Sequence, residues 1–526
     1  MDRRTLLKWV PLTMGSAVLS GIPGESAIAN ELREFTAHAK SYAVVNVKDY
    51  GAVGDGKHDD TAAIQRTITA AGPDGSWILP SGRFLLSDTI YPLNGQRIIC
   101  LGVLQPLRDV SLLSLEGVIN VRIMGSLHVE DPSSVTSDSY SLKLSGGSGS
   151  SATRFCFVDK IFMNNVANPL YLRNANGNSL PHINCQSTRG SGITVHTVAT
   201  DHGGVHDNDF GAVMLVGSQG SVYGIAYNVA SGTPVVGGNK WGRVSCLSFG
   251  GDGLNLNVNG GGQIEEWFDT LICDSCGGDG VVMNAGTQKI FIGNLWTAEC
   301  GNNGLTLNGA LHNPVMSVEI ANFYSHSNKH YGALVAHTTD LLVGQAKVHS
   351  NGLSGIRIVQ SSYRVNFGIC VTSNNIDGLA SGTQGHFGFD DGGDPSSSQI
   401  TVGTLQALDG YSLSQATQSH LGVNPSVGMV SPPASPLVST TIYRNTLPFG
   451  ILIYQPTFAA TAGTAGSVDV ALGASKHPPL LFTQQVHGST TRTAPEVIQL
   501  RVPPGWYYSF TAHATTLLDA RIQGEP

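Results

Sequence analysis

The sequence is poor in charge and lacks long apolar runs. Charged residues make up 13% of its 526 residues, about half the usual share. With 37 acidic against 29 basic residues and a formal net charge of −8, it lacks the basic surface of a nucleic-acid-binding protein. No segment offers the ~18 consecutive apolar residues of a membrane span. We therefore expect neither a nucleic-acid nor a membrane partner.

Glycine, in contrast, is abundant, with 65 residues. Hydrophobic residues reach 41%, which excludes a long disordered tail over most of the chain. The length exceeds the ~250–300 residues at which one compact core stops growing. Few charges also disfavour long surface helices. The composition therefore predicts β structure with many tight turns, in two or more units or an elongated repeat.

The first residues carry export features. Arg3 and Arg4 precede a moderately apolar stretch, and the triplet AIA follows at 27–29. This order resembles a bacterial twin-arginine signal peptide with its cleavage site. We therefore expect residues 1–29 to be a signal peptide, and the mature chain to be periplasmic or secreted.

Residues 45–87 predict a helix between strands. A glycine turn leads to Asp59 or Asp60 as helix N-cap, and Gly72 to Gly75 end the helix. The apolar positions of the helix are Ala62, Ile64, Ile68 and Ala71. A single helix followed by strands is what a solenoid needs to cover its first coil.

The string DYGAVGDGKHDDTAAIQ, which begins at Asp49, resembles the opening of the pectate-lyase-like superfamily. That superfamily includes rhamnogalacturonases, polygalacturonase relatives and phage tailspike depolymerases. The resemblance extends over about 44–104 and implies a right-handed parallel β-helix that acts on polysaccharide. Because this segment is the cap in that family, Asp55, Asp59 and Asp60 are expected to support a turn and a helix start rather than catalysis.

A repeat recurs in the middle of the chain, as in SFGGDGLNLN, SCGGDGVVMN and ECGNNGLTLN. Its glycines are spaced by 23–28 residues, which is typical of a solenoid, and the lack of a helix in each unit selects a β-helix. The glycines are Gly253, Gly280, Gly304, Gly332, Gly355 and Gly378, with Gly192 and Gly224 extending the series less cleanly.

Aligning the coils on these glycines defines columns. The positions one and three residues after each glycine are apolar and are predicted to face the interior. They are Leu254/Leu256, Val281/Met283, Leu305/Leu307, Ala333/Val335 and Ile356/Ile358. Four residues before the glycine, Asn328, Asn351 and Asn374 predict a buried asparagine ladder, with a sugar-binding row as the alternative.

The eight cysteines fall partly in columns. Cys246 aligns with Cys273, and Cys276 aligns with Cys300, which favours stacked buried thiols. The spacing of Cys273 and Cys276 matches a C-x-x-C motif, but a second such pair is missing, so we expect no metal site. A disulfide between Cys276 and Cys300 is the alternative for an oxidising compartment.

Two carboxylates form the first candidate catalytic pair. Asp252 and Asp279 each precede a column glycine, so they lie about one coil, ~4.8 Å, apart. That spacing suits the ~5–5.5 Å of a retaining glycosidase pair. The alternative is that both aspartates support a turn before the glycine.

A second cluster is predicted at the end of the preceding strand. Asp274, His326 and His349 share a column, and Glu299 stands one residue beyond it. Such groups could protonate a glycosidic oxygen or abstract a proton beside a uronate carboxyl group. The alternative is a solvated turn.

Residues 260–269 form an expanded connection. Glu266, or its neighbour Glu265, is a candidate acid or base, and Trp267 could stack on a sugar ring. Trp296 adds a second candidate platform, with Tyr324 and Tyr331 as further aromatic surface. The polar run at 201–209 is interpreted as a loop, with Ca²⁺ or substrate contact as the alternative.

The catalytic motifs of polygalacturonases are missing. No NTD triplet occurs, and Gly385-His386-Phe387 interrupts the expected GHG. The resemblance therefore covers the cap and the coils without supplying catalytic residues.

The organisation expected from these patterns is an all-β chain. A parallel β-helix occupies 30–400, a Ser/Pro/Gly-rich linker 401–440 and a small β-sandwich 441–526. The string VPPGWYY near the C-terminus resembles C-terminal modules of tailspike-like proteins, which often trimerise, and this implies a homotrimer.

The function expected from the sequence is that of an exported polysaccharide-degrading enzyme, a glycoside hydrolase with paired carboxylates. One alternative is a lyase acting on a uronate-containing glycan, which would want Ca²⁺ and a Lys or Arg base; otherwise no cofactor is expected. Lys329 and Arg357 are candidates for substrate binding, and Lys347 is a further cation. The other alternative is a non-catalytic glycan-binding or surface-structural β-helix.

Overall fold

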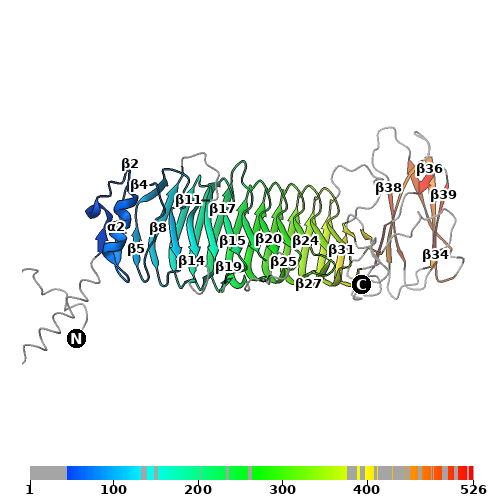
Figure 1. Ribbon diagram of the computed structural model, residues 1–526. Helices are drawn as coiled ribbons and strands as arrows, with labels where there is room; N and C mark the ends of the chain where they lie inside the picture. Colours follow the sequence, from blue (N-terminus) through cyan, green and yellow to red (C-terminus); the bar gives the residue numbers. More distant parts are fainter. Residues whose placement is uncertain are drawn as a thin grey trace, which may run out of the picture.

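The computed structural model describes residues 44–131, 139–146, 152–201, 203–230, 232, 236–258, 264–375, 388–390 and 397–407, and short segments between 411 and 524. These residues form an elongated parallel β-solenoid, followed by a smaller antiparallel unit at its far end (Figure 1). The predicted all-β solenoid with an N-terminal helix is confirmed. The predicted signal peptide at 1–29 lies outside the described residues and stays a prediction.

One wall of the solenoid is a 20-stranded sheet, called here the long-strand sheet. Its successive coils pair in parallel, and along each strand buried and outward-facing residues alternate. The main strands are β8 (Arg122–Glu130), β11 (Phe157–Asn164), β14 (Ser179–Thr188), β17 (Asp209–Gly217), β19 (Val236–Leu247), β21 (Ile264–Asp274), β23 (Gln288–Ala298), β25 (Val315–His326), β27 (Thr338–His349), β29 (Tyr363–Ser373) and β31 (Ser398–Ala407). Shorter members are β1 (Val44–Asn46), β2 (Asp55–Asp59), β3 (Ser76–Leu79), β4 (Arg83–Leu86), β5 (Arg97–Cys100), β6 (Val103–Pro106), β10 (Thr153–Arg154), β13 (Ala175–Asn176) and β16 (Val205–His206).

The opposite wall is a 12-stranded sheet, called here the short-strand sheet. The predicted inward pairs of the repeat, such as Leu254 and Leu256, are buried in it. Its strands are β7 (Leu113–Glu116), β9 (Tyr140–Ser145), β12 (Asn168–Arg173), β15 (Ile193–Thr197), β18 (Ile225–Val229), β20 (Leu254–Val258), β22 (Val281–Asn284), β24 (Leu305–Asn308), β26 (Ala333–Ala336), β28 (Ile356–Val359), β30 (Phe389–Asp390) and β32 (Tyr411–Ser412).

The repeating glycine allows neighbouring coils to approach each other closely. A Cβ atom at Gly253 would lie 2.6 Å from both the Cys273 Sγ and the Gly280 carbonyl oxygen.

One coil of the predicted glycine series differs from the others. The Ile356 N–H donates to the Gly388 carbonyl at 2.9 Å, so Gly388 takes the place expected for Gly378, which lies outside the described residues. The coil between β29 and β30 is longer than its neighbours, and the regular spacing therefore failed there.

The asparagine ladder is also confirmed with a shift of one residue. The Asn328 backbone N–H donates to the Asn351 side-chain oxygen at 3.1 Å, and Asn351 donates in the same way to Asn375. Asn374, the predicted member, instead adopts a left-handed backbone with φ 52°, as Ser350 does at 56°. The left-handed residue precedes the ladder residue in each of these coils, so the longer coil moved the ladder to Asn375.

The first coil is covered by α2 (Thr61–Ala71), which follows the 3₁₀ helix η2 (Val47–Tyr50). Asp60 precedes α2, and its carboxylate accepts from the Val53 and Gly54 N–H groups at 2.6 and 3.1 Å. Asp59 accepts from the Thr61 N–H at 3.0 Å. The structure thus gives these acids the turn and cap roles expected of them. The buried face of α2 consists of Ala63, Ile64, Thr67 and Ile68. Of the other two apolar positions expected there, Ala71 is partly buried and Ala62 is exposed.

The solenoid continues beyond position 400, where we expected the linker. β31 extends to Ala407, and β32 pairs with β30. Beyond it the described segments form one five-stranded and one four-stranded antiparallel sheet, as the predicted sandwich unit requires. The strands are β33 (Met429–Val430), β34 (Tyr443–Arg444), β35 (Ile451–Ala459), β36 (Ala465–Gly473), β37 (Leu480–His487), β38 (Glu496–Val502), β39 (Tyr507–His513), β40 (Thr515–Leu517) and β41 (Arg521–Gly524). No helix in the described ranges has the length and apolar character needed to cross a membrane. The domain limits and the homotrimer stay predictions.

Candidate functional site

A shallow channel runs along the outer face of the long-strand sheet, between two columns of outward-facing side chains. The registers of successive strands define both columns. The first column contains Lys160, His182, Ala212, Arg243, Thr270, Asn294, Asn322, Gln345 and Ile369. The second contains Phe162, Asn184, Met214, Ser245, Ile272, Trp296, Tyr324, Lys347 and Val371. We call the part from β8 to β19 the N-terminal stretch and the part from β21 to β29 the C-terminal stretch.

The C-terminal stretch is open to solvent and has a cavity volume of about 440 Å³. Aromatic rings and amides line it, with one cation, and no Asp or Glu is among its lining residues. Trp296 is 41% exposed, and its ring lies 4.5 Å from that of Tyr324. The Lys347 Nζ lies 5.6 Å from the Tyr324 ring centroid. This surface combines the stacking platform and the positive charge that suit an anionic sugar.

Beside this stretch, the Tyr324 Oη lies 2.7 Å from the His349 Nε2. Tyr324 is in β25 and His349 ends β27, on the next coil. The His349 Nδ1 lies 3.2 Å from the Ser350 Oγ. A proton on Nδ1 donated to Ser350 leaves Nε2 free to accept the proton of the Tyr324 hydroxyl.

The electrostatics favour a neutral His349. Partial burial, then the neighbouring His326 and Lys347, lower the pKa of His349 below its ordinary value. The His326 and His349 rings stack with centroids 5.2 Å apart. A neutral imidazole next to a phenol can take the phenolic proton, so the pair has the components of a general base.

The predicted column at the end of the strands exists. The register pairs Asp274 with Ala298, Ala298 with His326 and His326 with His349. Glu299 follows β23 in an exposed left-handed turn position with φ 51°. Asp274 is half-buried and accepts from the Ser275 hydroxyl at 2.9 Å. The structure therefore brings Asp274, Glu299 and His326 to one edge, beside Trp296.

Asp252 and Asp279 instead belong to a turn ladder. The Asp252 carboxylate accepts from the Asp279 N–H at 2.8 Å, and Asp279 accepts from the Asn303 N–H at 2.7 Å. Burial raises the pKa of Asp279, and the negative charge of Asp252 contributes. Both carboxyl groups thus hold the coils together before the short-strand sheet, away from the channel. This is the turn-supporting alternative, and their catalytic role stays a prediction.

Glu266 was expected on a surface connection, but the structure places its side chain inside the solenoid at 0% exposure. It ends an internal ladder that includes Asn208 and Asn239. The Asn239 Nδ2 donates to Glu266 at 2.7 Å, and the Trp241 Nε1 donates at 2.8 Å. Burial raises the pKa of Glu266 to about 8. A polymer outside the wall cannot contact this carboxyl group, so the prediction that it acts on substrate was wrong; its neighbour Glu265 lies 3.5 Å from the Lys289 Nζ.

The remaining predicted binding residues lie apart from the channel. Trp267 is 37% exposed and stacks on Phe291, with ring centroids 5.8 Å apart, but it does not line the channel. Arg357 is in β28 of the short-strand sheet and forms a 2.7 Å ion pair with Asp390. Lys329 is exposed in the turn after β25. The coil places Arg357 on another wall, although it is close in sequence to His349.

Metal-binding and thiol chemistry find little support. Within the part of the chain that the structure describes, no three His, Cys, Asp or Glu residues are grouped as a metal site. In the run at 201–209, Asp201 forms a 2.8 Å ion pair with Arg173 and is buried. All eight cysteines are buried and free, so the predicted stacked thiols are observed and Cys276 is not bonded to Cys300.

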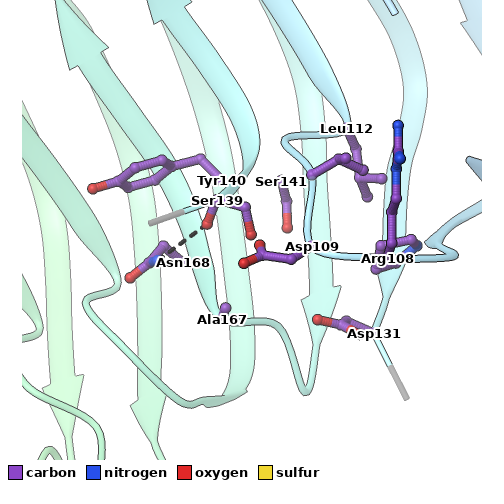
Figure 2. A pocket seen from close by; sticks show the side chains of 11 residues that line it. Arg108, Asp109, Leu112, Asp131, Ser139, Tyr140, Ser141, Ala167 and Asn168 are labelled. Atoms are coloured by element: carbon purple, nitrogen blue, oxygen red, sulfur yellow. Dashed lines mark hydrogen bonds between the residues drawn. The ribbon is translucent and has the colours of Figure 1, made fainter. Parts of the chain in front are cut away.

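A second, polar pocket with a cavity volume of only about 10 Å³ lies nearer the N-terminal cap (Figure 2). Asp109 and Asn168 line it, and Asn168 donates to the Ser139 carbonyl at 3.0 Å. Asp131 also lines it, and its carboxylate forms a 2.7 Å ion pair with Arg189. The Asn168 contact joins adjacent coils, and the Asp131–Arg189 pair spans two coil-to-coil steps.

Sequence reasoning did not single out the Tyr324–His349 pair or the cations of the N-terminal stretch. The glycine alignment placed His349 in the column of His326, and Tyr324 stands two residues before His326 in the same strand. Tyr324 and Lys347 were named as aromatic surface and as a cation, and outward alternation counted back along each strand could have shown that they share one outward column. Lys160, His182 and Arg243 precede the clear repeat, so no column was available for them.

Comparison with known proteins finds similarity to one protein family near the N-terminus of the chain. Residues 44–101 match the family model described as rhamnogalacturonase A/epimerase, pectate lyase-like. Plasmin and fibronectin-binding protein A of Streptococcus pneumoniae is 42% identical over 69 residues, which are 11% of this chain and 10% of that protein. Mannuronan C5-epimerase AlgE3 of Azotobacter vinelandii is 50% identical over 52 residues, 10% of this chain and 3% of that enzyme. The matches therefore span a small fraction of these relatives.

Among solved structures, the A-module of mannuronan C-5 epimerase AlgE6 of Azotobacter vinelandii aligns with 71% of this chain and 96% of its own. The TM-score is 0.34 and the identity 16%. Residues 44–101 are therefore similar to the rhamnogalacturonase A/epimerase, pectate lyase-like family, and in this chain they are followed by a parallel β-solenoid.

Proposed function

We propose that the C-terminal stretch of the channel binds a uronate-containing polysaccharide and that Tyr324, with His349 behind it, removes the C5 proton of a uronate residue. The observation that carries the proposal is the 2.7 Å contact between the Tyr324 Oη and the His349 Nε2 beside an open, acid-free channel. Chemistry at C5 is shared by uronate lyases and uronate epimerases.

Each residue has a distinct role in this reaction. Tyr324 passes its hydroxyl proton to the His349 Nε2, and the phenolate oxygen takes the C5 proton. Lys347 neutralises the uronate carboxylate, which lets that group accept negative charge as the C5–H bond breaks. Trp296 stacks on a sugar ring and fixes its position.

Two outcomes follow from the same intermediate. In elimination, the electron pair of the C5–H bond forms the C4–C5 double bond while the C4–O bond breaks, and the departing oxygen takes the proton that Tyr324 removed from C5. In epimerisation, C5 takes a proton from water on the opposite face, the Tyr324–His349 pair returns its extra proton to solvent, and the chain stays intact. The geometry of the Tyr324–His349 pair serves the first step of both.

A glycoside hydrolase remains the second candidate, supported by the position of Asp274 and Glu299 on adjacent coils next to Trp296. Two carboxyl groups at such an edge could serve as acid and base or nucleophile on a glycosidic bond. This candidate leaves the contact between Tyr324 and His349 without a role in the reaction.

A panel of uronate and neutral polysaccharides, assayed in deuterated buffer, tests the proposal. Unsaturated uronide, seen by ultraviolet absorbance, or deuterium at C5, seen by NMR, supports it. Both signals should fall together in Tyr324→Phe. New reducing ends without either signal would favour the hydrolase and overturn C5 chemistry. Retained glycan binding with no product would favour a non-catalytic binding protein and also overturn it.

A further inference from the structure

The N-terminal stretch of the channel has a composition that the proposed reaction does not use. It is open to solvent and has a cavity volume of about 580 Å³ on the outer face of β8, β11, β14, β17 and β19. Two cations, Lys160 and Arg243, line one side together with the imidazole of His182, and all three side chains are exposed. No Asp or Glu is among its lining residues, although the whole chain has 37 acidic residues and a net charge of −8.

The cations of this stretch are available to a ligand. The ion pairs formed among the described residues involve other arginines and lysines, such as Arg173, Arg189 and Lys289. Facing the cations, Phe162 and Met214 are 38% and 42% exposed. Phe162 is held at its edge by His128, with ring centroids 4.9 Å apart. The stretch therefore presents charge on one side and an apolar platform on the other.

The two stretches are continuous. The register pairs Arg243 with Thr270 and Ser245 with Ile272, so the last residues of the N-terminal stretch adjoin the first residues of the C-terminal stretch. Seven coil-to-coil steps separate β11 from β27. At ~4.8 Å per step, Lys160 and Lys347 are ~34 Å apart along the solenoid axis.

We propose that the N-terminal stretch is a second binding site for the same acidic polysaccharide, which it holds remote from the Tyr324–His349 pair. This inference rests on the proposed function for the identity of the polymer. Uronate carboxylates pair with Lys160 and Arg243, the imidazole of His182 donates a hydrogen bond to the same polymer, and sugar faces lie on Phe162 and Met214. Because even Arg243, the cation of this stretch nearest to Lys347, lies four coils before it, a long chain engages both stretches and a short oligosaccharide engages one.

Binding measurements without turnover test the inference. The variant combines Lys160→Met, His182→Gln and Arg243→Met, and affinity electrophoresis in gels containing polygalacturonate or alginate measures its binding. We expect the variant to be retarded less than wild type, with an apparent affinity for the polymer that is lower by roughly tenfold. The reason is that each exposed charge pair contributes ~0.2–1 kcal/mol. The deficit should grow with chain length from tetrauronide to polymer, and it should shrink at high salt.

Lys240→Met is the matched control, because Lys240 is an exposed cation of the same strand, β19, outside the channel lining. Polymer binding equal to wild type in the triple variant would overturn the inference. A loss of polymer binding in Lys240→Met as large as that in the triple variant would also overturn it. So would retardation of the wild-type protein in gels of neutral dextran as strong as in gels of the acidic polymers. The assay separates the two proposals. If the wild-type protein shows no C5 chemistry but the triple variant loses polymer binding, this binding site is supported and the proposed function fails. If the wild-type protein shows C5 chemistry and the triple variant binds polymer normally, the proposed function is supported and this binding site fails.

Discussion

The hydroxyl oxygen of Tyr324 lies 2.7 Å from the Nε2 of His349, although the two residues belong to successive coils and are separated by 25 positions in sequence. The parallel register of β25 and β27 makes this contact, since it stacks His349 over His326, two residues beyond Tyr324. Lys347 of the same strand as His349 faces the channel. One coil-to-coil step thus assembles a phenol, an imidazole and a cation.

Replacing Tyr324 by Phe should remove the proposed base while retaining the ring that lines the channel. We expect turnover of a uronate polymer to fall by ~10²–10⁴-fold, the usual contribution of general base catalysis, with little change in binding. Steady-state kinetics and affinity electrophoresis measure the two effects. Tyr363→Phe, at the start of β29, is the control. Turnover within twofold of wild type in Tyr324→Phe would remove this residue from the mechanism.

The pH profile should report His349. Its imidazole must be neutral to accept a proton, and burial and the neighbouring positive groups lower its pKa. Activity should therefore rise with pH through an inflection below the ordinary value of ~6.5. His326→Asn removes one of those positive neighbours, so the inflection of kcat/KM should move to higher pH. An unchanged inflection, or the same movement in His312→Asn, would contradict this assignment.

Stability should depend on pH through Glu266. Its pKa of about 8 in the folded chain lies above the value of ~4.3 in the unfolded chain. Between these values the folded state holds a proton that the unfolded state has released. The contribution of Glu266 to the free energy of unfolding is therefore fully present below about pH 4 and is lost as the pH rises to about 8. The slope should reach up to ~1.4 kcal/mol per pH unit. Thermal melting across this range measures it.

Glu266→Gln should flatten that dependence because an amide does not titrate. It should also lower stability at acid pH, since an amide accepts from only one of Asn239 and Trp241 and leaves the other donor unpaired at a cost of ~1–3 kcal/mol. A parallel pH dependence in both proteins would show that another group is responsible.

The asparagine ladder should carry much of the stability of its coils. Asn351 accepts from the Asn328 backbone and side chain and donates to Asn375. Asn351→Ala leaves these buried groups unpaired, and we expect a loss of ~2–4 kcal/mol from the free energy of unfolding. Asn322→Ala, at an exposed position of β25, should change it by less than ~0.5 kcal/mol. Comparable losses in both variants would contradict the ladder role.

All eight thiols should react once the chain is unfolded without reductant, because none is bonded in the structure. In the native state they should react slowly, since burial raises the pKa of Cys100 to about 12 and disfavours the thiolate. A thiol reagent that absorbs on reaction gives both counts. Six reactive thiols in the unfolded protein would show a disulfide, with Cys276 and Cys300 the first pair to examine.

The sequence predicted the fold well where a rule depends on position along the chain. The glycine spacing found the coils, and Gly253 shows why, since a side chain there would clash with Cys273 of the next coil. The same rule failed where a coil is longer, so Gly388 and Asn375 replaced the expected residues. The site was harder to predict, because Glu266 follows a connection rather than a repeat and no pattern showed on which side of the wall it lies.

The sequence by itself determined the solenoid, the helix start at Asp59 and Asp60, and the inward face of each repeat, because turn chemistry and alternation are local properties. It did not determine that the Asp59 carboxylate contacts the first helical N–H while that of Asp60 binds the preceding turn. The tertiary structure decided which polar residues meet. Stacking of parallel strands brought Tyr324 to His349, gave the Asp252 carboxylate the N–H of Asp279 as a partner, and buried Glu266 beside Trp241. Each of these contacts joins residues that are more than 20 positions apart in sequence. They meet only because of the register between stacked coils, which cannot be derived from the local sequence.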